Sequence, residues 1–412
     1  MSQQRALKLH VKMSEDGISS LDIESLRADT PGTLHNIHLN NAGAGLMPIP
    51  VLLAIKEHLD FESQVGGYEA SDKRESEIRA VYEALGSLIG SDPENVAITE
   101  NATASFIQAL SSVSFKAGDV IVTTRNDYAS NQIMYLSLQS RMGVELVRVP
   151  EDPLGGLDVM AMEEAIHRRR PKLVAVTHVP TNSGLVQRVA DVGAMCSQRD
   201  ILYLVDACQS VGQMPVDVRD IGCDFLSATA RKFLRGPRGV GFLYVSDRAL
   251  DLGLEPLFPD MRAADWIDAD LYQPAHGAQR FENWEFPYAL VLGMGRAAEY
   301  AIDLGIEAIR DRAWALAAMV RDRLSEIDKL QVLDRGIEQC AIATVSVDGH
   351  NSSDLVASLA EAGINTSLST REYAVLDFDD KGVDSAVRIS PHYYNSEEEI
   401  EQLAETLYKI VN

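Results

Sequence analysis

Short apolar runs rich in β-branched residues alternate with helix-length amphipathic stretches through the middle of the chain. Alternation of strands and helices on this scale predicts an α/β domain, in which helices cover both faces of a largely parallel sheet. The last two runs are so close in sequence that we expect one of them to be antiparallel. The predicted strands cover residues 96–99, 120–124, 145–150, 173–179, 201–207, 224–229 and 239–245.

The pattern changes after about residue 286. Two long helical patterns meet near Gly305, and short strands then alternate with helices up to the C-terminus. The last helix is expected to begin after Ser396, because Glu399 completes a capping box with it. We therefore predict an N-terminal segment (residues 1–35) that packs on a small domain, a large α/β domain (residues 36–290) and the small α+β domain itself (residues 291–412).

Acidic residues outnumber basic ones, with 61 Asp and Glu against 37 Lys and Arg and a formal net charge of -24. That charge repels phosphate backbones and anionic membranes, so neither nucleic acid nor a membrane is an expected partner. The chain has no apolar run long enough to cross a bilayer and no secretory signal at its start, which favours a cytoplasmic protein. Its 4 cysteines form no CxxC pair, so we expect free thiols and no metal site.

Two residues of chemical interest stand at strand ends between residues 203 and 244. Asp206 closes a hydrophobic strand, at the position where open α/β sheets bind their ligands. Lys232 follows another hydrophobic strand and precedes a glycine-rich stretch, GPRGVG. Either residue alone is commonplace, because most lysines are solvated and most strand-end aspartates are caps. The two together indicate a shared site.

The stretches around these residues, DACQSVGQ and RKFLRGPRGVGFLY, resemble the class V aminotransferase and cysteine desulfurase group of pyridoxal phosphate (PLP) enzymes. The resemblance extends over nearly the whole chain, through HLNNAGAGLMP, TENATASFIQAL, NDYASN, HVPTNSGLV, RFENWE and VRISPHYYNSEEEI. It implies the PLP-dependent transferase fold type I, in which a large domain with a mostly parallel seven-stranded sheet carries a smaller α+β C-terminal domain. It also implies a homodimer that binds PLP and a small amino-acid substrate.

The resemblance assigns roles to individual residues. Lys232 matches the lysine that holds PLP as a Schiff base and then acts as the base at the substrate Cα. Asp206 matches the carboxylate that pairs with the pyridine nitrogen and raises its proton affinity. Arg388 matches the arginine that grips the substrate α-carboxylate. The other implied cofactor contacts are Asn101, Ala102 and Thr103 at a helix N-terminus for the phosphate, Thr229 and Arg231 from its other side, Tyr128 stacked on the ring, and Gln209 at the ring hydroxyl.

Two contacts stay open at this point. Thr181 falls where desulfurases place an Asn that contacts the ring hydroxyl, and Asn182 lies one residue away, so either could serve. Trp284 and its neighbour Glu285 replace small residues through which a partner subunit reaches the phosphate in many relatives, which puts that contact in question. The candidates for selecting the substrate side chain are Asn41, Tyr68, Trp284 and Tyr373.

A missing residue bears on the reaction. Desulfurases carry a nucleophilic Cys shortly before the carboxylate-binding Arg, whereas residues 364–388 contain none, so a persulfide mechanism is disfavoured. SQVGGYEA and RISPHYYN are similar to segments of the isopenicillin N epimerase-like proteins and of carbon-sulfur lyases of the ergothioneine type.

We therefore expect a PLP-dependent enzyme that acts on an L-α-amino acid. The leading reaction is β-elimination from a cysteine derivative or cysteine-conjugate sulfoxide. A class V aminotransferase, which converts an amino acid to a keto acid, is the alternative, and epimerisation is a third outcome of the same carbanion. All three need the same electron sink and base, so the sequence leaves the choice among them open.

Overall fold

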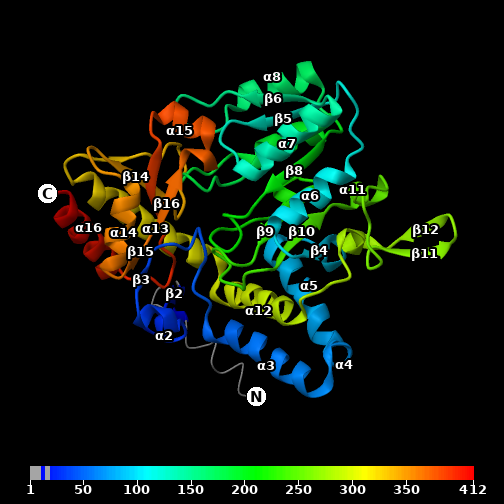
Figure 1. The fold of residues 1–412 in the computed structure, drawn as a ribbon, viewed down its shortest axis with the longest axis horizontal. Helices are drawn as coiled ribbons and strands as arrows, with labels where there is room; N and C mark the ends of the chain where they lie inside the picture. The colour runs from blue at the N-terminus through cyan, green and yellow to red at the C-terminus, as the bar shows by residue number, and fades with distance from the viewer. Residues whose placement is uncertain (1–10, 14–18) are drawn as a thin grey trace.

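The computed structural model describes residues 11–13 and 19–412 (Figure 1). A large sheet enclosed by helices occupies one side of the molecule, and a smaller sheet with the C-terminal helices occupies the other (Figure 1). None of the helices in the described part of the chain is both long and apolar enough to cross a membrane.

Seven strands form the large sheet, in the order β4-β10-β9-β8-β7-β5-β6. β10 pairs antiparallel with both of its neighbours, whereas the pairs from β9 to β6 are all parallel. The predicted seven-stranded, mostly parallel sheet is therefore confirmed. Its strands are β4 (Val96–Thr99), β5 (Val120–Thr124), β6 (Glu145–Val149), β7 (Leu173–Thr177), β8 (Leu202–Asp206), β9 (Phe225–Thr229) and β10 (Gly241–Val245).

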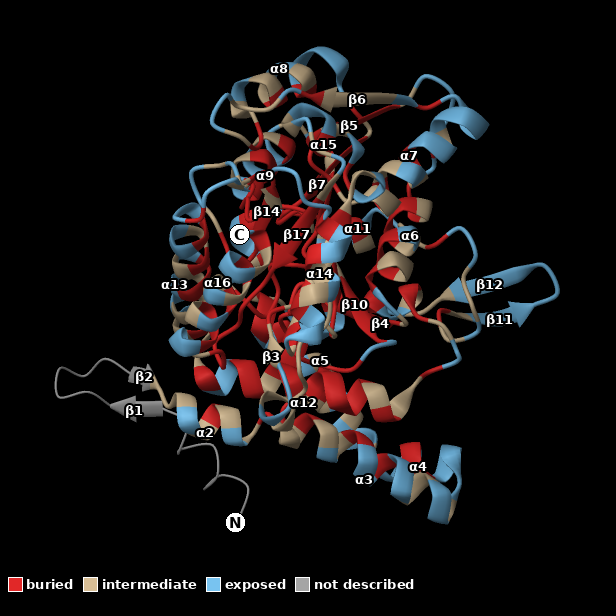
Figure 2. Cartoon of the chain, turned by 60° about the vertical axis from the view of Figure 1, so that its left-hand side comes forward, coloured by how far each residue is buried: buried red, intermediate tan, exposed pale blue. Residues whose placement is uncertain are grey.

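The central strands of this sheet are buried on both faces, which explains why they are mainly apolar, whereas the edge strand β6 is partly exposed (Figure 2). In β7, Val174 and Val176 belong to the core on one face, while Leu173 and Ala175 belong to the core on the other. Successive side chains of a strand point to opposite faces, so a strand covered on both sides needs an unbroken apolar run. The helices of this part are α3 (Ile49–Val65), α4 (Gly67–Lys73), α5 (Glu75–Ile89), α6 (Ala102–Ser112), α7 (Ala129–Met142), α8 (Val159–Arg169), α9 (Val189–Ser197), α10 (Val218–Ile221) and α11 (Asp247–Asp251).

A four-stranded antiparallel sheet, β13-β14-β17-β16, forms the C-terminal part. Gly305, with φ of 86°, separates the two long helices near the predicted break, and the capping box of Ser396 and Glu399 is present. The predicted domain division between residues 290 and 291 falls inside α12, so a helix packed on α3 and α5, rather than a linker, joins the two parts. The elements are α12 (Tyr288–Leu304), α13 (Ile306–Ser325), β13 (Leu330–Val332), β14 (Ala343–Val347), α14 (Ser352–Glu361), β15 (Ile364–Asn365), β16 (Ser367–Thr370), α15 (Val375–Lys381), β17 (Ser385–Ile389) and α16 (Glu397–Val411).

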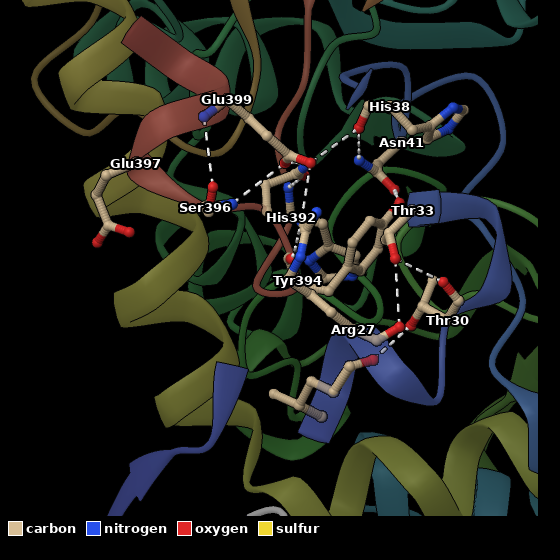
Figure 3. Close-up of polar contacts among 12 residues, drawn as sticks. Arg27, Thr30, Thr33, His38, Asn41, His392, Tyr394, Ser396, Glu397 and Glu399 are labelled. Atoms are coloured by element: carbon tan, nitrogen blue, oxygen red, sulfur yellow. Dashed lines mark hydrogen bonds and ion pairs between the residues drawn. The ribbon is translucent and has the colours of Figure 1, made fainter. Parts of the chain in front are cut away.

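The N-terminal segment contacts the C-terminal part through polar side chains (Figure 3). Arg27, on α2 (Ile23–Ala28), donates to Glu399 at 2.8 Å and to the backbone carbonyl of Tyr394 at 3.2 Å. β3 (Ile37–His38), which the sequence places in the large domain, pairs in parallel with β15. Residues 1–10 and 14–18 of the predicted segment lie outside the described residues, and the domain boundaries stay a prediction.

One element, a hairpin that projects from the large domain, was absent from the sequence-based prediction (Figures 1 and 2). Its strands β11 (Ala264–Asp268) and β12 (Leu271–Pro274) pair antiparallel. Trp266 is 80% exposed, and Ile267 and Leu271 are also exposed. Because neither face of the hairpin packs on a core, its strands lack the regular alternation by which strands are recognised.

The burial of His392 makes the stability of the protein depend on pH. Its Nε2–H donates to the carbonyl of Phe233 at 2.8 Å, and its ring packs edge-on against Phe233 and Tyr393. Burial lowers the pKa of the imidazole from 6.5 to about 3. Between these values the unfolded chain binds a proton that the folded chain does not, so stability is lost as pH falls from about 6.5 toward 3.

We expect His392→Gln to have a lower free energy of unfolding than the parent at pH 7. Between pH 7 and pH 5, however, this free energy should fall by about 2 kcal/mol less in the variant than in the parent. Urea unfolding at both pH values measures the difference, and His35→Gln, at an exposed position, is the control. Equal pH dependence in His392→Gln and the parent would contradict the prediction.

Candidate active site

One pocket lies at the carboxyl ends of β7 and β8. This edge of a parallel sheet is where open α/β proteins bind their ligands. The pocket joins segments that are far apart in sequence, including the N-terminus of α6 and the loops that follow β8 and β9. The predicted cofactor contacts that line it are Asn101, Ala102, Thr103, Tyr128, Thr181, Asp206, Gln209, Thr229, Arg231 and Lys232.

Asp206 is the last residue of β8 and is only 4% exposed. Its Oδ1 accepts a hydrogen bond from the backbone N–H of Cys208 at 3.0 Å, and its Oδ2 accepts one from the amide of Asn131 at 3.0 Å. No described Lys, Arg or His forms an ion pair with it. Because a buried carboxylate is costly without a positive partner, Asp206 is suited to a cationic N–H group supplied from the pocket.

Lys232 lies on the loop after β9, and its amine is buried in the same pocket. Nζ is 5.9 Å from the centroid of the Tyr128 ring. Burial, together with the charge of Arg231, lowers the pKa of the amine below its usual value. An amine in this environment gives up its proton more readily, as a nucleophile or base requires. Gly45 lets the chain pack against this loop, because a Cβ there would lie 2.6 Å from the backbone oxygen of Lys232.

The N-terminus of α6 forms another wall of the pocket. The side chain of Asn101 caps the helix by accepting from the N–H of Ala104 at 2.9 Å. The N–H groups of Ala102 and Thr103 donate to no described residue, and together with the helix dipole they favour an anion. The helix can approach the sheet because a Cβ at Gly241 would lie 3.0 Å from the Ala102 nitrogen.

Thr181 and Asn182, the two adjacent candidates for the ring-hydroxyl contact, differ in where their side chains lie. Thr181 lines the pocket, where its hydroxyl accepts from Gln209 at 2.9 Å and from Arg388 at 2.8 Å. Asn182 points away and donates to Asp377 at 2.6 Å. Thr181 is therefore the better placed of the two to contact a ligand, and the predicted cofactor contact of Asn182 finds no support in this geometry.

Two arginines make the pocket region cationic. Arg388 is 8% exposed, and besides Thr181 it reaches Asn40 Oδ1 at 3.2 Å, while its buried Nε has no described partner. Burial lowers the pKa of Arg388 to about 10. Arg231 donates to the backbone carbonyl of Gly43, and its pKa is also lowered by burial. Unused donors on a buried guanidinium are suited to a carboxylate.

Comparison with known proteins identifies the family. The family model for aminotransferase class-V matches residues 37–403. This chain belongs to that family. Similar curated proteins include the probable cysteine desulfurases of Methanothermobacter thermautotrophicus and Pyrococcus abyssi, each 28% identical over 94% of this chain and over 98% and 97% of their own length.

Solved structures share the fold. The apo cysteine desulfurase from Thermococcus onnurineus NA1 has a TM-score of 0.87 and 26% identity, covering 94% of this chain and 98% of its own. The complex between the cystine C-S lyase C-DES and its reaction product, cysteine persulfide, has a TM-score of 0.82 at 23% identity, covering 92% and 99%. The family and the fold type I architecture expected from the sequence are both confirmed.

As a class V enzyme the protein depends on PLP, and the pocket fits this cofactor. The free N–H groups of Ala102 and Thr103 suit a phosphate, and Asp206 is a carboxylate without a cation of its own. The buried Gln209 Oε1 has no described hydrogen-bond partner, as expected for an atom that contacts a bound ligand. With the Lys232 amine, these groups make the donor set that PLP requires.

The four residues predicted to select the substrate side chain lie outside the pocket. Asn41 is fully buried in the polar cluster of Figure 3, where its Oδ1 accepts from the Tyr394 hydroxyl at 2.6 Å. Its amide nitrogen donates to the backbone carbonyl of Ser390 at 2.8 Å, so Asn41 joins the N-terminal and C-terminal parts. The other three, exposed by 68%, 46% and 53% and absent from the pocket lining, are Tyr68, Trp284 and Tyr373.

Three residues that sequence reasoning missed complete the lining, namely Thr177, Val179 and Cys208. Thr177 ends the strand next to that of Asp206, so its strand-end position was an available signal. Cys208, for which the sequence predicted only a free thiol, forms part of the pocket wall. Burial raises the pKa of its thiol well above the usual value, so it is a poor source of thiolate.

A short helix, α15, occupies the segment where the desulfurase Cys would be expected. Asp377 on α15 forms an ion pair with Lys381 at 2.7 Å, with the two side chains only 5% and 3% exposed. The same carboxylate accepts from Asn182 at 2.6 Å and from Asn126 at 3.1 Å, both in the large domain. This buried cluster fastens the small domain beside the pocket.

We expect Asp377→Asn to destabilise the protein by about 3 to 5 kcal/mol, because it leaves the buried charge of Lys381 unpaired. Chemical denaturation measures the loss. Asp379→Asn, also on α15, breaks an exposed pair with Arg371 and should leave the midpoint close to that of the parent. Equal effects of the two substitutions would show that the Asp377 cluster does not fasten the domains.

Proposed function

We propose that this class V protein is a carbon-sulfur lyase that acts by β-elimination on a cysteine derivative or cysteine-conjugate sulfoxide. One observation carries the proposal: the PLP pocket holds the lysine, carboxylate and nearby arginine of amino-acid chemistry without a reactive thiol. Relatives named cysteine desulfurase, and the structural neighbour named cystine C-S lyase, support chemistry at a carbon-sulfur bond.

The described side chains divide the work of such a reaction. Bound PLP supplies an electron sink for the pair left at Cα. Asp206 holds the proton on the ring nitrogen, because its negative charge favours the protonated form. Lys232, with its lowered pKa, takes the proton from Cα, and Arg388 binds the α-carboxylate so that Cα–H is directed at this amine.

The elimination breaks the Cα–H and Cβ–S bonds and forms a Cα=Cβ bond, and hydrolysis then yields pyruvate and ammonia. The sulfur leaves with the electron pair of the Cβ–S bond as a thiolate or sulfenate. The pKa values of Cys196 and Cys340 are raised to about 12 by burial, and that of Cys223 is raised too. The four cysteines, all among the described residues, thus lack the thiolate that would capture the sulfur as an enzyme persulfide.

We expect Lys232→Ala to abolish both the visible absorbance of enzyme-bound PLP and the release of pyruvate, since the amine that anchors the cofactor and takes the proton is gone. Spectra of the purified proteins and a pyruvate assay measure these losses. Lys56→Ala, at an exposed position on α3, is the control. If Lys232→Ala kept the visible absorbance of enzyme-bound PLP, the assignment of this lysine as the PLP anchor would be wrong.

The choice of reaction is tested with three substrates on the parent protein. An S-substituted cysteine sulfoxide should release pyruvate in stoichiometric amount with ammonia, and the cofactor spectrum should return to its starting form. Stable conversion of the cofactor to pyridoxamine phosphate by L-alanine, with no pyruvate from the sulfoxide, would identify an aminotransferase instead. Alanine-plus-sulfide production from L-cysteine would identify a desulfurase.

We expect Arg388→Gln to lower kcat/KM for the amino-acid substrate by about 100-fold, because a charged hydrogen-bonded pair contributes roughly 2 to 5 kcal/mol. An analogue that lacks the α-carboxylate should react equally with parent and variant. If kcat/KM falls equally for the two substrates, Arg388 does not bind the carboxylate.

The homodimer and the cytoplasmic location stay predictions from the sequence, and light scattering tests the first of them.

A further inference from the structure

A second buried carboxylate, Asp127, lies close behind Asp206 and has no part in the chemistry above. It immediately precedes Tyr128 and is 3% exposed. Both of its oxygens accept hydrogen bonds, and no described cation forms an ion pair with it. The donors are the backbone N–H of Tyr128 at 2.7 Å, the amides of Asn131 at 3.1 Å and Gln132 at 2.8 Å, and the hydroxyls of Thr123 at 3.2 Å and Thr177 at 2.5 Å.

This arrangement is built for a negative charge. The N–H groups of Tyr128, Asn131 and Gln132 can only donate, so an ionised carboxylate satisfies them better than a carboxylic acid. Burial raises the pKa of Asp127, and the charge of Asp206 adds to the effect, while the hydrogen bonds oppose it. Core packing alone gives no reason to bury a second charge here, since a buried ion is costly.

Asn131 connects the two carboxylates. Its Nδ2 donates to Asp127 Oδ1 at 3.1 Å and to Asp206 Oδ2 at 3.0 Å. Asn131 is itself 2% exposed, so water does not compete for these hydrogens. One amide therefore sets the orientation of Asp206 relative to Asp127.

We propose that Asp127 is a positioning residue for the cofactor: through Asn131 it orients Asp206, and by its charge it strengthens the hold of Asp206 on the proton of the PLP ring nitrogen. The proposal rests on PLP dependence and not on the lyase reaction, so it stands if the enzyme proves to be an aminotransferase. It also explains why the loop before α7 presents Asp127 inward while Tyr128 lines the pocket.

Other charged or titratable groups face this pair. Asp127 is faced by Arg148, which donates to Gln132 at 2.7 Å, and by Tyr135; Asp206 is faced by Lys232 and Cys208. The pKa values of Tyr135 and Cys208 are raised well above their usual values by burial, so both stay neutral through the neutral pH range. The protonation of the ring nitrogen near neutral pH therefore reflects the charges of the two carboxylates, Lys232 and Arg148.

The test is ¹⁵N NMR of the holoenzyme loaded with PLP that is ¹⁵N-labelled at the ring nitrogen. Asp127→Asn keeps the volume and removes the charge. We expect its ring nitrogen to lose the proton at a pH about one unit lower than in the parent, a tenfold loss of proton affinity, and its PLP to dissociate more readily. Asp127→Glu keeps the charge and should retain most of the parental profile.

Two further variants distinguish the proposed orienting role of Asp127 from a general loss of stability. Asn131→Ala should shift the profile in the same direction by a smaller amount, because Asp127 keeps its charge but the link is cut; it also serves if Asp127→Asn does not fold. Asp224→Asn removes another buried carboxylate, 4% exposed and paired with Arg248, and should leave the profile unchanged. An unchanged ring-nitrogen profile in both Asp127→Asn and Asn131→Ala would overturn the proposal.

Discussion

Two ionisable side chains, those of Asp206 and Lys232, are buried in one pocket without forming an ion pair with each other. Charges removed from water are costly unless their surroundings supply compensating contacts, so the pocket has to be held rigidly around them. Asp206 is fixed by the Cys208 backbone and by Asn131. Lys232 is fixed by a loop that approaches Gly45 with no room for a side chain. The parallel strands and the two hydrophobic cores that pack on them hold these residues in place.

The same arrangement accounts for the family chemistry. The cofactor of class V enzymes brings a phosphate, a ring nitrogen and a carbonyl carbon, and the pocket offers an anion-binding helix end, a carboxylate and an amine to match. Because any reaction that begins at Cα uses these groups, they do not choose among lyase, aminotransferase and epimerase. The proposed lyase reaction rests on the surroundings of these groups: the segment before Arg388 holds α15, fastened by the buried cluster of Asp377, Lys381 and Asn182, and contains no Cys.

Much of the site was predictable because motif residues follow strand ends, and strand ends in a parallel sheet meet at one edge. Asp206 and Lys232 were found in this way, and the family resemblance added Asn101. The ambiguity between Thr181 and Asn182 could not be resolved, since one residue of slippage on a loop reverses which side chain points inward. Tyr68, Trp284 and Tyr373 are exposed and do not line the pocket, and a linear pattern of residues does not report such exposure.

The sequence by itself determined the sheet, the family and most of the residues that line the pocket, because apolar periodicity and local motifs depend on neighbouring residues along the chain. Only the tertiary structure decided how residues more than a hundred positions apart combine. The hydrogen bonds of Arg388 to Thr181, of Asn182 to Asp377 and of Asn131 to Asp206 are of that kind. Such contacts form when folding brings distant strands and loops together, so burial and hydrogen-bond geometry in the folded chain, rather than spacing, select them.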